Sequence, residues 1–176
     1  PDFSMGYVEG SSLSAKVAAG PLPPREAAEY VKQVAEAVVF AHEHGVIHRD
    51  LKPANVLLDA NDQPRVTDFG LAKRVGGDSD LTSTGQILGT PSYMPPEQAA
   101  GSSDITTSVD IYSLGAILYE IIAGRPPFQG STPVETLMQV IHEIPAKPSL
   151  NANVDRGLEL ICMKCLAKDP SLRYVS

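Results

Sequence analysis

The sequence predicts an α+β protein in which helices dominate, and three observations lead to this fold class. Apolar residues recur at helical spacing in four stretches, 31–42, 111–122, 134–141 and 158–165. Short β-prone pieces follow the first of these stretches, at 46–47, 56–58 and 65–67. Segment 70–101 keeps no sustained period and is rich in Gly, Ser, Thr and Pro. An irregular segment of that length in a compact domain usually carries function.

The composition fits one globular domain and argues against several classes of partner. The chain has 176 residues, of which 43% are hydrophobic and 20% charged, enough apolar material for a core. A formal net charge of -7 argues against bulk attraction to nucleic acid or to an anionic membrane. Two cysteines are too few for a disulfide framework, which favours a reducing compartment, and we expect a cytoplasmic location.

The chain shows no sign of a membrane-spanning or targeting segment. No apolar run reaches the roughly 18 residues that a membrane helix needs, and the best candidate, 115–124, is interrupted by Glu120. Pro1-Asp2-Phe3 does not resemble a charged leader ahead of an apolar stretch. Because the chain does not open with Met, we expect it to begin partway through a longer protein, which could carry a membrane anchor elsewhere.

The elements before residue 70 are predicted from apolar spacing and turn residues. Phe3 to Val8 reads as a short strand that ends in a loop, Gly10-Ser11-Ser12. A helix follows the proline-rich residues 21–24, and Gly45 stands where a C-terminal cap belongs. The β-prone pieces 56–58 and 65–67 flank Asn61-Asp62-Gln63-Pro64 and predict a hairpin.

The remainder of the chain is predicted to be helical. Residues 111–122 are apolar on nearly every face, so we expect that helix to be buried all round. Thr132-Pro133-Val134-Glu135 is a capping box with proline at the first helical position. The apolar positions of the helix it begins are Val134, Leu137, Met138 and Ile141. Cys162 and Cys165 lie on the last helix; because no second pair or histidine partner follows, we favour core packing over a redox or zinc site.

Polar residues cluster around the β-prone pieces. His48 to Asn55 follow the first piece, and Asp68 and Phe69 follow the last. Asp50, Lys52 and Asn55 therefore place three polar groups at one loop mouth, and Asp68 can face them. Asparagine and aspartate oxygens suit Mg²⁺, which is usually bound by few protein ligands and by substrate phosphates. A remaining carboxylate could orient and deprotonate a hydroxyl.

With these residues the chain resembles the eukaryotic-like (Hanks-type) serine/threonine protein kinases found in bacteria. The pattern H-R-D-L-x-x-x-N is met by His48 to Asn55, and D-F-G by 68–70. Residues 89–97 resemble the end of the family's activation loop, and 110–115 its central buried helix. Later landmarks appear in order as Arg125-Pro126-Pro127-Phe128 and Asp169-Pro170-Ser171-Leu172-Arg173-Tyr174.

The resemblance implies part of a kinase domain. Nothing in the chain matches the Gly-rich loop, the strand lysine or its glutamate partner, all of which precede the hinge in the family. We therefore expect a hinge at 3–12 and a C-terminal lobe at 13–176, with the N-terminal lobe absent and the chain truncated before the lobe's last helix. The implied activity is transfer of the ATP γ-phosphoryl group to protein Ser/Thr hydroxyls in the parent protein, with the fragment alone inactive. The alternative is a non-catalytic kinase-like binding module or a truncated gene product.

The resemblance also implies a role for each matched residue. Asp50 would orient the substrate hydroxyl or accept its proton, and Lys52 would neutralise the transferring phosphoryl group. Lys52 and Thr90, which would help to position the substrate, mark the Ser/Thr class. Asn55 and Asp68 would hold Mg²⁺. Each of these residues, taken singly, could instead be a solvated polar loop residue.

The nucleotide site is implied by the hinge and by one strand residue. Met5 would be the gatekeeper, and backbone groups of Gly6 and Val8 would hydrogen-bond adenine. Gly6 replaces the family's common Glu, but this position uses its backbone. Leu57 would form the apolar floor under adenine, although plain strand core is compatible with the same burial.

Regulatory and structural roles complete the implied set. Arg49 would receive a phosphate from the activation loop, with Thr82 and Thr84 preferred over Ser79 and Ser83 as acceptors; a solvated loop is the alternative. His48 would pack beneath Phe69. Asp110 would accept backbone N–H bonds from 48–49, and Glu97 would form a largely buried ion pair with Arg173.

Overall fold

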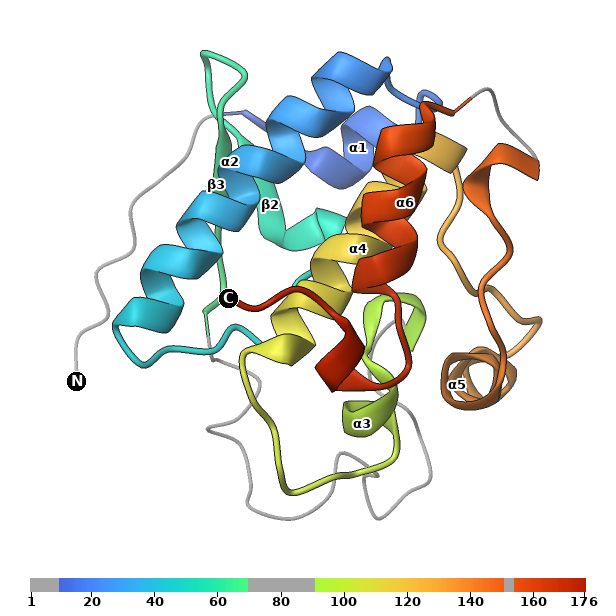
Figure 1. Ribbon diagram of the computed structural model, residues 1–176. Coiled ribbons are helices and arrows are strands. Elements are labelled where there is room, and N and C mark those ends of the chain that lie inside the picture. Colours follow the sequence, from blue (N-terminus) through green and yellow to red (C-terminus); the bar gives the residue numbers. More distant parts are fainter. Residues whose placement is uncertain (1–9, 70–90, 151–153) are drawn as a thin grey trace.

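The protein is described by a computed structural model that covers residues 10–69, 91–150 and 154–176 (Figure 1). Three strands, six α-helices and four short 3₁₀ turns are found in these ranges. The strands are β1 (Ser11–Ser12), β2 (Val56–Leu58) and β3 (Pro64–Val66). The helices are α1 (Leu13–Val17), α2 (Pro24–Glu43), α3 (Pro96–Ala99), α4 (Ser108–Ala123), α5 (Pro133–His142) and α6 (Arg156–Cys165). The 3₁₀ turns are Pro53–Asn55, Pro91–Tyr93, Pro148–Leu150 and Pro170–Leu172. The predicted, mainly helical α+β class is confirmed.

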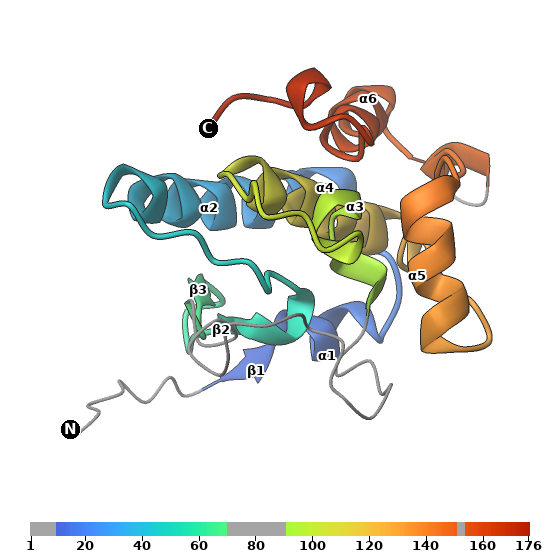
Figure 2. The ribbon, with the colours of Figure 1, turned by 90° about the horizontal axis from the view of Figure 1, so that it is seen from below.

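The elements form layers around α4. Figure 2 shows the small sheet and α1 on one side, α2 and α4 in the middle and α6 on the opposite side, with α5 standing at one end. Helix α4 packs against both α2 and α6. Its side chains are buried from Val109 to Ile122 with the exception of Glu120, as its apolar sequence predicted. The helix ends at Gly124, which adopts the left-handed conformation that favours glycine.

A glycine permits the close crossing of α4 and α6. A Cβ atom on Gly115 would lie 2.5 Å from Cβ of Cys165, so only glycine fits without movement of α6. At the same crossing the Cys162 thiol donates to the Gly115 carbonyl at 3.4 Å. Burial raises the pKa of Cys162, and raises that of Cys165 to about 11. Both cysteines are thus core residues, as the sequence predicted.

The sheet corrects two sequence expectations. Ser11 and Ser12 were expected in a loop, but they pair antiparallel with Leu58 and Leu57. Gly10 makes this pairing possible, because a Cβ there would lie 1.7 Å from the Leu58 carbonyl oxygen. Residues 46–47 were expected to be β-prone but form no strand, since no strand runs beside them in the described part of the chain. The β2–β3 hairpin is confirmed, with Val56 opposite Val66.

A polar cluster holds the hairpin turn to the helices. Lys16 of α1 donates to Asp62 in the turn at 2.7 Å and lies 3.0 Å from Glu26 of α2. The Tyr30 hydroxyl on α2 also donates to Asp62. A hairpin whose strands have only three residues each is marginally stable alone. These contacts therefore help to fix the hairpin on the domain.

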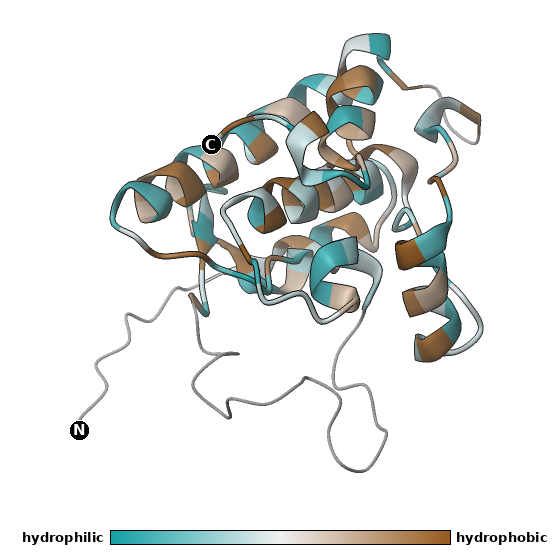
Figure 3. Ribbon diagram, turned by 60° about the horizontal axis from the view of Figure 1, so that its bottom comes forward, coloured by the Kyte–Doolittle hydropathy of each residue, from teal (hydrophilic) through white to brown (hydrophobic). Residues whose placement is uncertain are grey.

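Helix α5 begins as predicted, but its buried face only partly coincides with its apolar positions. Thr132 accepts from the Glu135 N–H at 3.1 Å, as a capping residue does. Of the four expected apolar positions, Val134 and Met138 are 57% and 50% exposed and Leu137 and Ile141 are half-buried, while Thr136 and Val140 are buried. The helix stands at the edge of the domain, where its apolar residues appear brown among polar neighbours (Figure 3). Its position against α3 and the 91–93 turn, rather than its periodicity, selects the buried face.

In the described ranges we find no helix that combines the length and the apolar character needed to cross a membrane.

Candidate active site

The hairpin brings Asn55 and Asp68 to one end of the sheet. Asn55 immediately precedes β2, and Asp68 follows β3 by two residues. The Thr67 N–H and hydroxyl both donate to the Asn55 carbonyl, at 2.9 and 3.2 Å. These bonds fasten the chain just before Asp68 to the backbone of Asn55. The Asp68 side chain is exposed, and its backbone adopts a left-handed φ of 61°.

The Asp50 carboxylate is held by its two polar neighbours. Lys52 Nζ donates to Asp50 Oδ2 at 2.7 Å. Asn55 Nδ2 donates to the Asp50 carbonyl at 2.8 Å and to Oδ2 at 3.2 Å. Asp50 retains 45% side-chain exposure, whereas Lys52 is 26% exposed. The three groups that the sequence placed at one loop mouth therefore form one hydrogen-bonded set with an accessible carboxylate.

The side-chain oxygens of Asn55 and Asp68 suit Mg²⁺, a cation that prefers oxygen ligands. The amide nitrogen of Asn55 is committed to Asp50, which leaves Oδ1 to act as a ligand. Asp68 adds an exposed carboxylate. Two oxygen ligands beside open solvent match the way Mg²⁺ binds, with few protein groups and its remaining positions on water or phosphate. No group of three His, Cys, Asp or Glu side chains that could hold a metal occurs in the described ranges.

A buried carboxylate anchors the loop that carries Asp50. Asp110 on α4 is fully buried and accepts the N–H groups of His48 and Arg49, each at 2.8 Å. The expected pair of backbone bonds is thus present. His42 Nε2 supplies a third hydrogen bond at 2.8 Å, which the sequence analysis missed. The helical spacing of His42 placed it on the inner face of α2, but no local signal pointed to Asp110, 68 residues away.

His48 is a packed core residue. It is 1% exposed, and its ring lies 4.8 Å from that of Phe69 at an interplanar angle of 55°. Nε2 donates to the Thr67 carbonyl at 2.8 Å, and Nδ1 accepts from the Asp50 N–H at 3.3 Å. Both ring nitrogens have hydrogen-bond partners, so His48 supports the loop beneath Asp50 rather than acting as a base.

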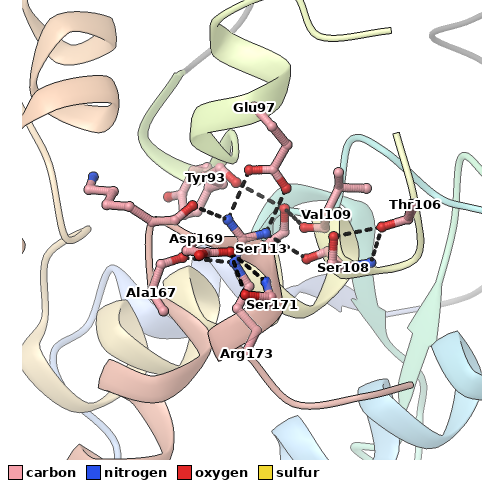
Figure 4. Close-up of polar contacts among 11 residues, drawn as sticks. Tyr93, Glu97, Thr106, Ser108, Val109, Ser113, Ala167, Asp169, Ser171 and Arg173 are labelled. Atoms are coloured by element: carbon pink, nitrogen blue, oxygen red, sulfur yellow. Dashed lines mark hydrogen bonds and ion pairs between the residues drawn. The ribbon is translucent and has the colours of Figure 1, made fainter. Parts of the chain in front are cut away.

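The expected Glu97–Arg173 ion pair is present (Figure 4). The guanidinium donates to both Glu97 oxygens, at 2.6 and 2.8 Å. Arg173 is 0% exposed at its side chain and Glu97 is 13% exposed. The guanidinium also donates to the carbonyls of Ala167, Ser108 and Lys168. Because every hydrogen-bonding group of the fork has a partner, the buried charge is compensated.

A second, half-buried contact near α3 was not predicted. The Tyr93 hydroxyl donates to Glu120 at 2.7 Å, and Ser113 donates to the Tyr93 carbonyl at 2.9 Å. Burial raises the pKa of both Tyr93 and Glu120. Glu120, which the sequence offered only as an interruption in an apolar run, therefore ties the 91–93 turn to α4.

Several predicted site residues fall outside the described ranges. They are Met5, Gly6 and Val8 of the hinge and Ser79, Thr82, Ser83, Thr84 and Thr90 of the loop. Leu57, the predicted adenine floor, is half-buried at the middle of β2.

Three features described above match what the resemblance to protein kinases implied. They are the hydrogen-bonded set around Asp50, the buried Asp110 that anchors its loop, and the Glu97–Arg173 ion pair. A family model described as "Protein kinase domain" matches residues 3–175, and the chain belongs to this family.

Bacterial serine/threonine kinases are among the curated proteins to which the chain is similar. The chain is 41% identical over 176 residues to "Serine/threonine-protein kinase PknB" of Mycobacterium leprae, covering 99% of the chain and 28% of that protein. It is 40% identical over 172 residues to "Serine/threonine-protein kinase PrkC" of Bacillus subtilis, covering 97% of the chain and 26% of that protein. It is 38% identical over 179 residues to "Probable serine/threonine-protein kinase SCO3848" of Streptomyces coelicolor, covering 100% of the chain and 26% of that protein. The chain thus spans only about a quarter of the length of these relatives.

Proposed function

We propose that this chain supplies the hinge (3–12) and the C-terminal lobe (13–176) of a bacterial Hanks-type serine/threonine protein kinase. The reaction is transfer of the γ-phosphoryl group of ATP to Ser or Thr hydroxyls of protein substrates. The observation that carries the proposal is the shared hydrogen bonding of the Asp50 carboxylate by Lys52 and Asn55, with Asp68 held beside them. The relatives named above, all serine/threonine kinases, support the choice of acceptor.

Asp50 and Lys52 carry out the transfer step in this proposal. The exposed carboxylate of Asp50 accepts a hydrogen bond from the incoming hydroxyl and takes its proton as the new O–P bond forms. The bond between the γ-phosphorus and the bridging oxygen of ATP breaks in the same step, and ADP leaves with that oxygen. Lys52, already 2.7 Å from this carboxylate, offsets the negative charge of the transferring phosphoryl group. Positioning dominates over basicity because the transition state of phosphoryl transfer is loose.

Asn55 and Asp68 provide the Mg²⁺ ligands. When bound, the ion would neutralise charge on the nucleotide phosphates. The fixed orientation of the Asn55 amide, set by its bonds to Asp50, keeps its oxygen directed away from that residue. Leu57 contributes an apolar surface for adenine, and the hinge residues Met5, Gly6 and Val8 complete that site.

Regulation is proposed at Arg49. A phosphate on Thr82 or Thr84 brings about -1.5 to -2 charge and would form charge-assisted bonds to its guanidinium. Thr90 is assigned to substrate positioning instead, because it lies close to the fixed turn that begins at Pro91. Mass spectrometry of the active longer kinase, with Thr82→Ala and Thr84→Ala variants, tests this assignment. An unphosphorylated loop together with a fully active double variant would remove it.

The two free, buried cysteines support a reducing compartment, and we place the domain in the cytoplasm.

The test compares two proteins. One is the 176-residue chain, and the other is a longer protein that joins it to a lobe with a Gly-rich loop and a strand lysine. We expect the longer protein to phosphorylate Ser/Thr substrates, its Asp50→Asn variant to be at least a thousandfold slower, and the short chain to be silent because the nucleotide phosphates lack their cover. An inactive longer protein that still binds a partner would favour the non-catalytic module.

A further inference from the structure

Arg49 is held from two sides in an unfavourable backbone conformation. Its φ is 69°, a left-handed conformation that is unfavourable for a residue with a side chain. Its N–H donates to Asp110 Oδ1 at 2.8 Å, and its carbonyl accepts from Gln98 Nε2 at 3.1 Å. The Arg49 carbonyl belongs to the same planar peptide as the Asp50 N–H. The bond from Gln98 therefore fixes the peptide plane that leads directly into Asp50.

Gln98 projects from a firmly anchored helix. It lies in the four-residue helix α3, which starts at Pro96 directly after Pro95, so two stiff proline residues fix its beginning. The preceding residue, Glu97, is paired with the fully buried Arg173 side chain. Neighbouring residues of one short helix thus reach two different anchors, the C-terminal Arg173 and the backbone of the catalytic loop. Any shift of α3 would be passed to Arg49 through Gln98.

The hydrogen bond from Gln98 Nε2 to the Arg49 carbonyl sets the orientation of the Gln98 side-chain amide. In the described part of the chain, Arg49 Nε and Gln98 Oε1 are both buried without a hydrogen-bond partner. Gln98 is therefore held by its amide nitrogen alone. Buried polar atoms without partners are uncommon and costly, so a role in catalysis would account for their persistence here.

From this geometry we infer that Gln98 is a positioning residue for Asp50, coupling the end of the activation segment at α3 to the catalytic loop. The inference rests on the proposed kinase function. Gln98 contacts no reacting atom; it acts by setting the peptide that carries Asp50. Asp110 holds the N–H side of Arg49, and Gln98 holds the carbonyl side.

The test uses the longer kinase with Gln98→Met, which keeps the side-chain length but removes the donor, and Gln98→Glu, which offers only acceptors to the carbonyl. Displacing a reacting group by about 1 Å can cost roughly a hundredfold in rate. We expect kcat to fall ten- to a hundredfold in both variants, while KM for ATP stays within twofold. Gln33→Met is the matched control, because it removes a glutamine side-chain bond to Glu29 on the exposed face of α2; its kcat should be unchanged.

A second readout separates positioning from loss of stability and from failure of the proposed function. Amide hydrogen exchange at Asp50, measured on the 176-residue chain, should accelerate in Gln98→Met and remain unchanged in Gln33→Met. Unchanged kcat and unchanged exchange in Gln98→Met would overturn the inference, as would a loss confined to KM or to thermal stability. If the unmodified longer kinase is no more active than its Asp50→Asn variant, the kinase function itself fails and the inference fails with it.

Discussion

Breaking the Glu97–Arg173 pair should strongly destabilise the chain. The guanidinium is 0% exposed, and two of its five donor bonds end on Glu97. Glu97→Gln keeps the shape of the side chain but leaves a buried positive charge without a counterion. Removing one partner of a buried ion pair costs about 3–5 kcal/mol. That is a large share of the roughly 5–15 kcal/mol that stabilises a typical domain.

Urea unfolding of the 176-residue chain measures this cost. The Glu97→Gln variant should lower the transition midpoint with an unchanged m-value, because the same surface is exposed on unfolding. The matched control is Asp59→Asn, which breaks a similar bond from an arginine, Arg65, whose side chain is 60% exposed. Exposed pairs of this kind contribute about 0–1 kcal/mol. The control should therefore unfold close to the unmodified chain.

A double-mutant cycle refines the test. Arg173→Met removes the charge but also leaves the carbonyls of Ala167, Ser108 and Lys168 without this donor. We expect the double variant to lose clearly less free energy of unfolding than the two single variants lose together, since no unpaired charge remains. A loss below 1 kcal/mol for Glu97→Gln, or additive losses in the cycle, would refute the reasoning.

Three other predictions concern buried or half-buried residues. Asp110→Ala should lower stability by about 1.5–3 kcal/mol or more, because three donors lose a charged acceptor; an unchanged melting temperature would contradict it. Gly115→Ala should cost about 1–3 kcal/mol by calorimetry, since its Cβ would meet that of Cys165, and Cys165→Gly in the same chain should recover part of the loss. Burial and the nearby Arg173 lower the pKa of Lys168 to about 8, from an ordinary value of 10.5, against the opposing influence of Glu143. The folded chain then binds fewer protons than the unfolded chain between these values, so stability should rise with pH from about 8 towards 10; Lys168→Met should remove this rise, and an identical pH slope in both proteins would exclude it.

The local elements could be predicted because their signals lie within a few residues. Helical spacing located α2, α4 and α6, and the capping residue at Thr132 located the start of α5. A turn between two β-prone pieces gave the hairpin. The all-round apolar sequence of α4 required burial whatever packs against it. The burial of the two cysteines in the core followed from the same local reasoning.

The resemblance to protein kinases supplied contacts that no local pattern contains. The bonds from 48–49 to Asp110 and the Glu97–Arg173 pair were expected only through ordered motifs, and the structure contains both. The roles of Asp50, Lys52, Asn55 and Asp68 were expected in the same way, and they stay proposals. Their grouping at one edge nevertheless follows from sequence, because a hairpin must bring its two ends together.

Tertiary structure alone decided the remaining features. Residues 46–47 have β propensity but no neighbouring strand, whereas Ser11–Ser12 have little propensity but meet the free edge of β2. The buried face of α5 depends on its neighbours and not on its apolar spacing. The contacts of His42 with Asp110 and of Gln98 with Arg49 join residues 68 and 49 positions apart. The sequence therefore determined the four longer helices and the hairpin, since spacing, caps and turns act locally. Tertiary packing decided which backbone groups the polar side chains bind. A buried polar group must be hydrogen-bonded, and its partner is whichever group the packing of distant segments places within hydrogen-bond distance.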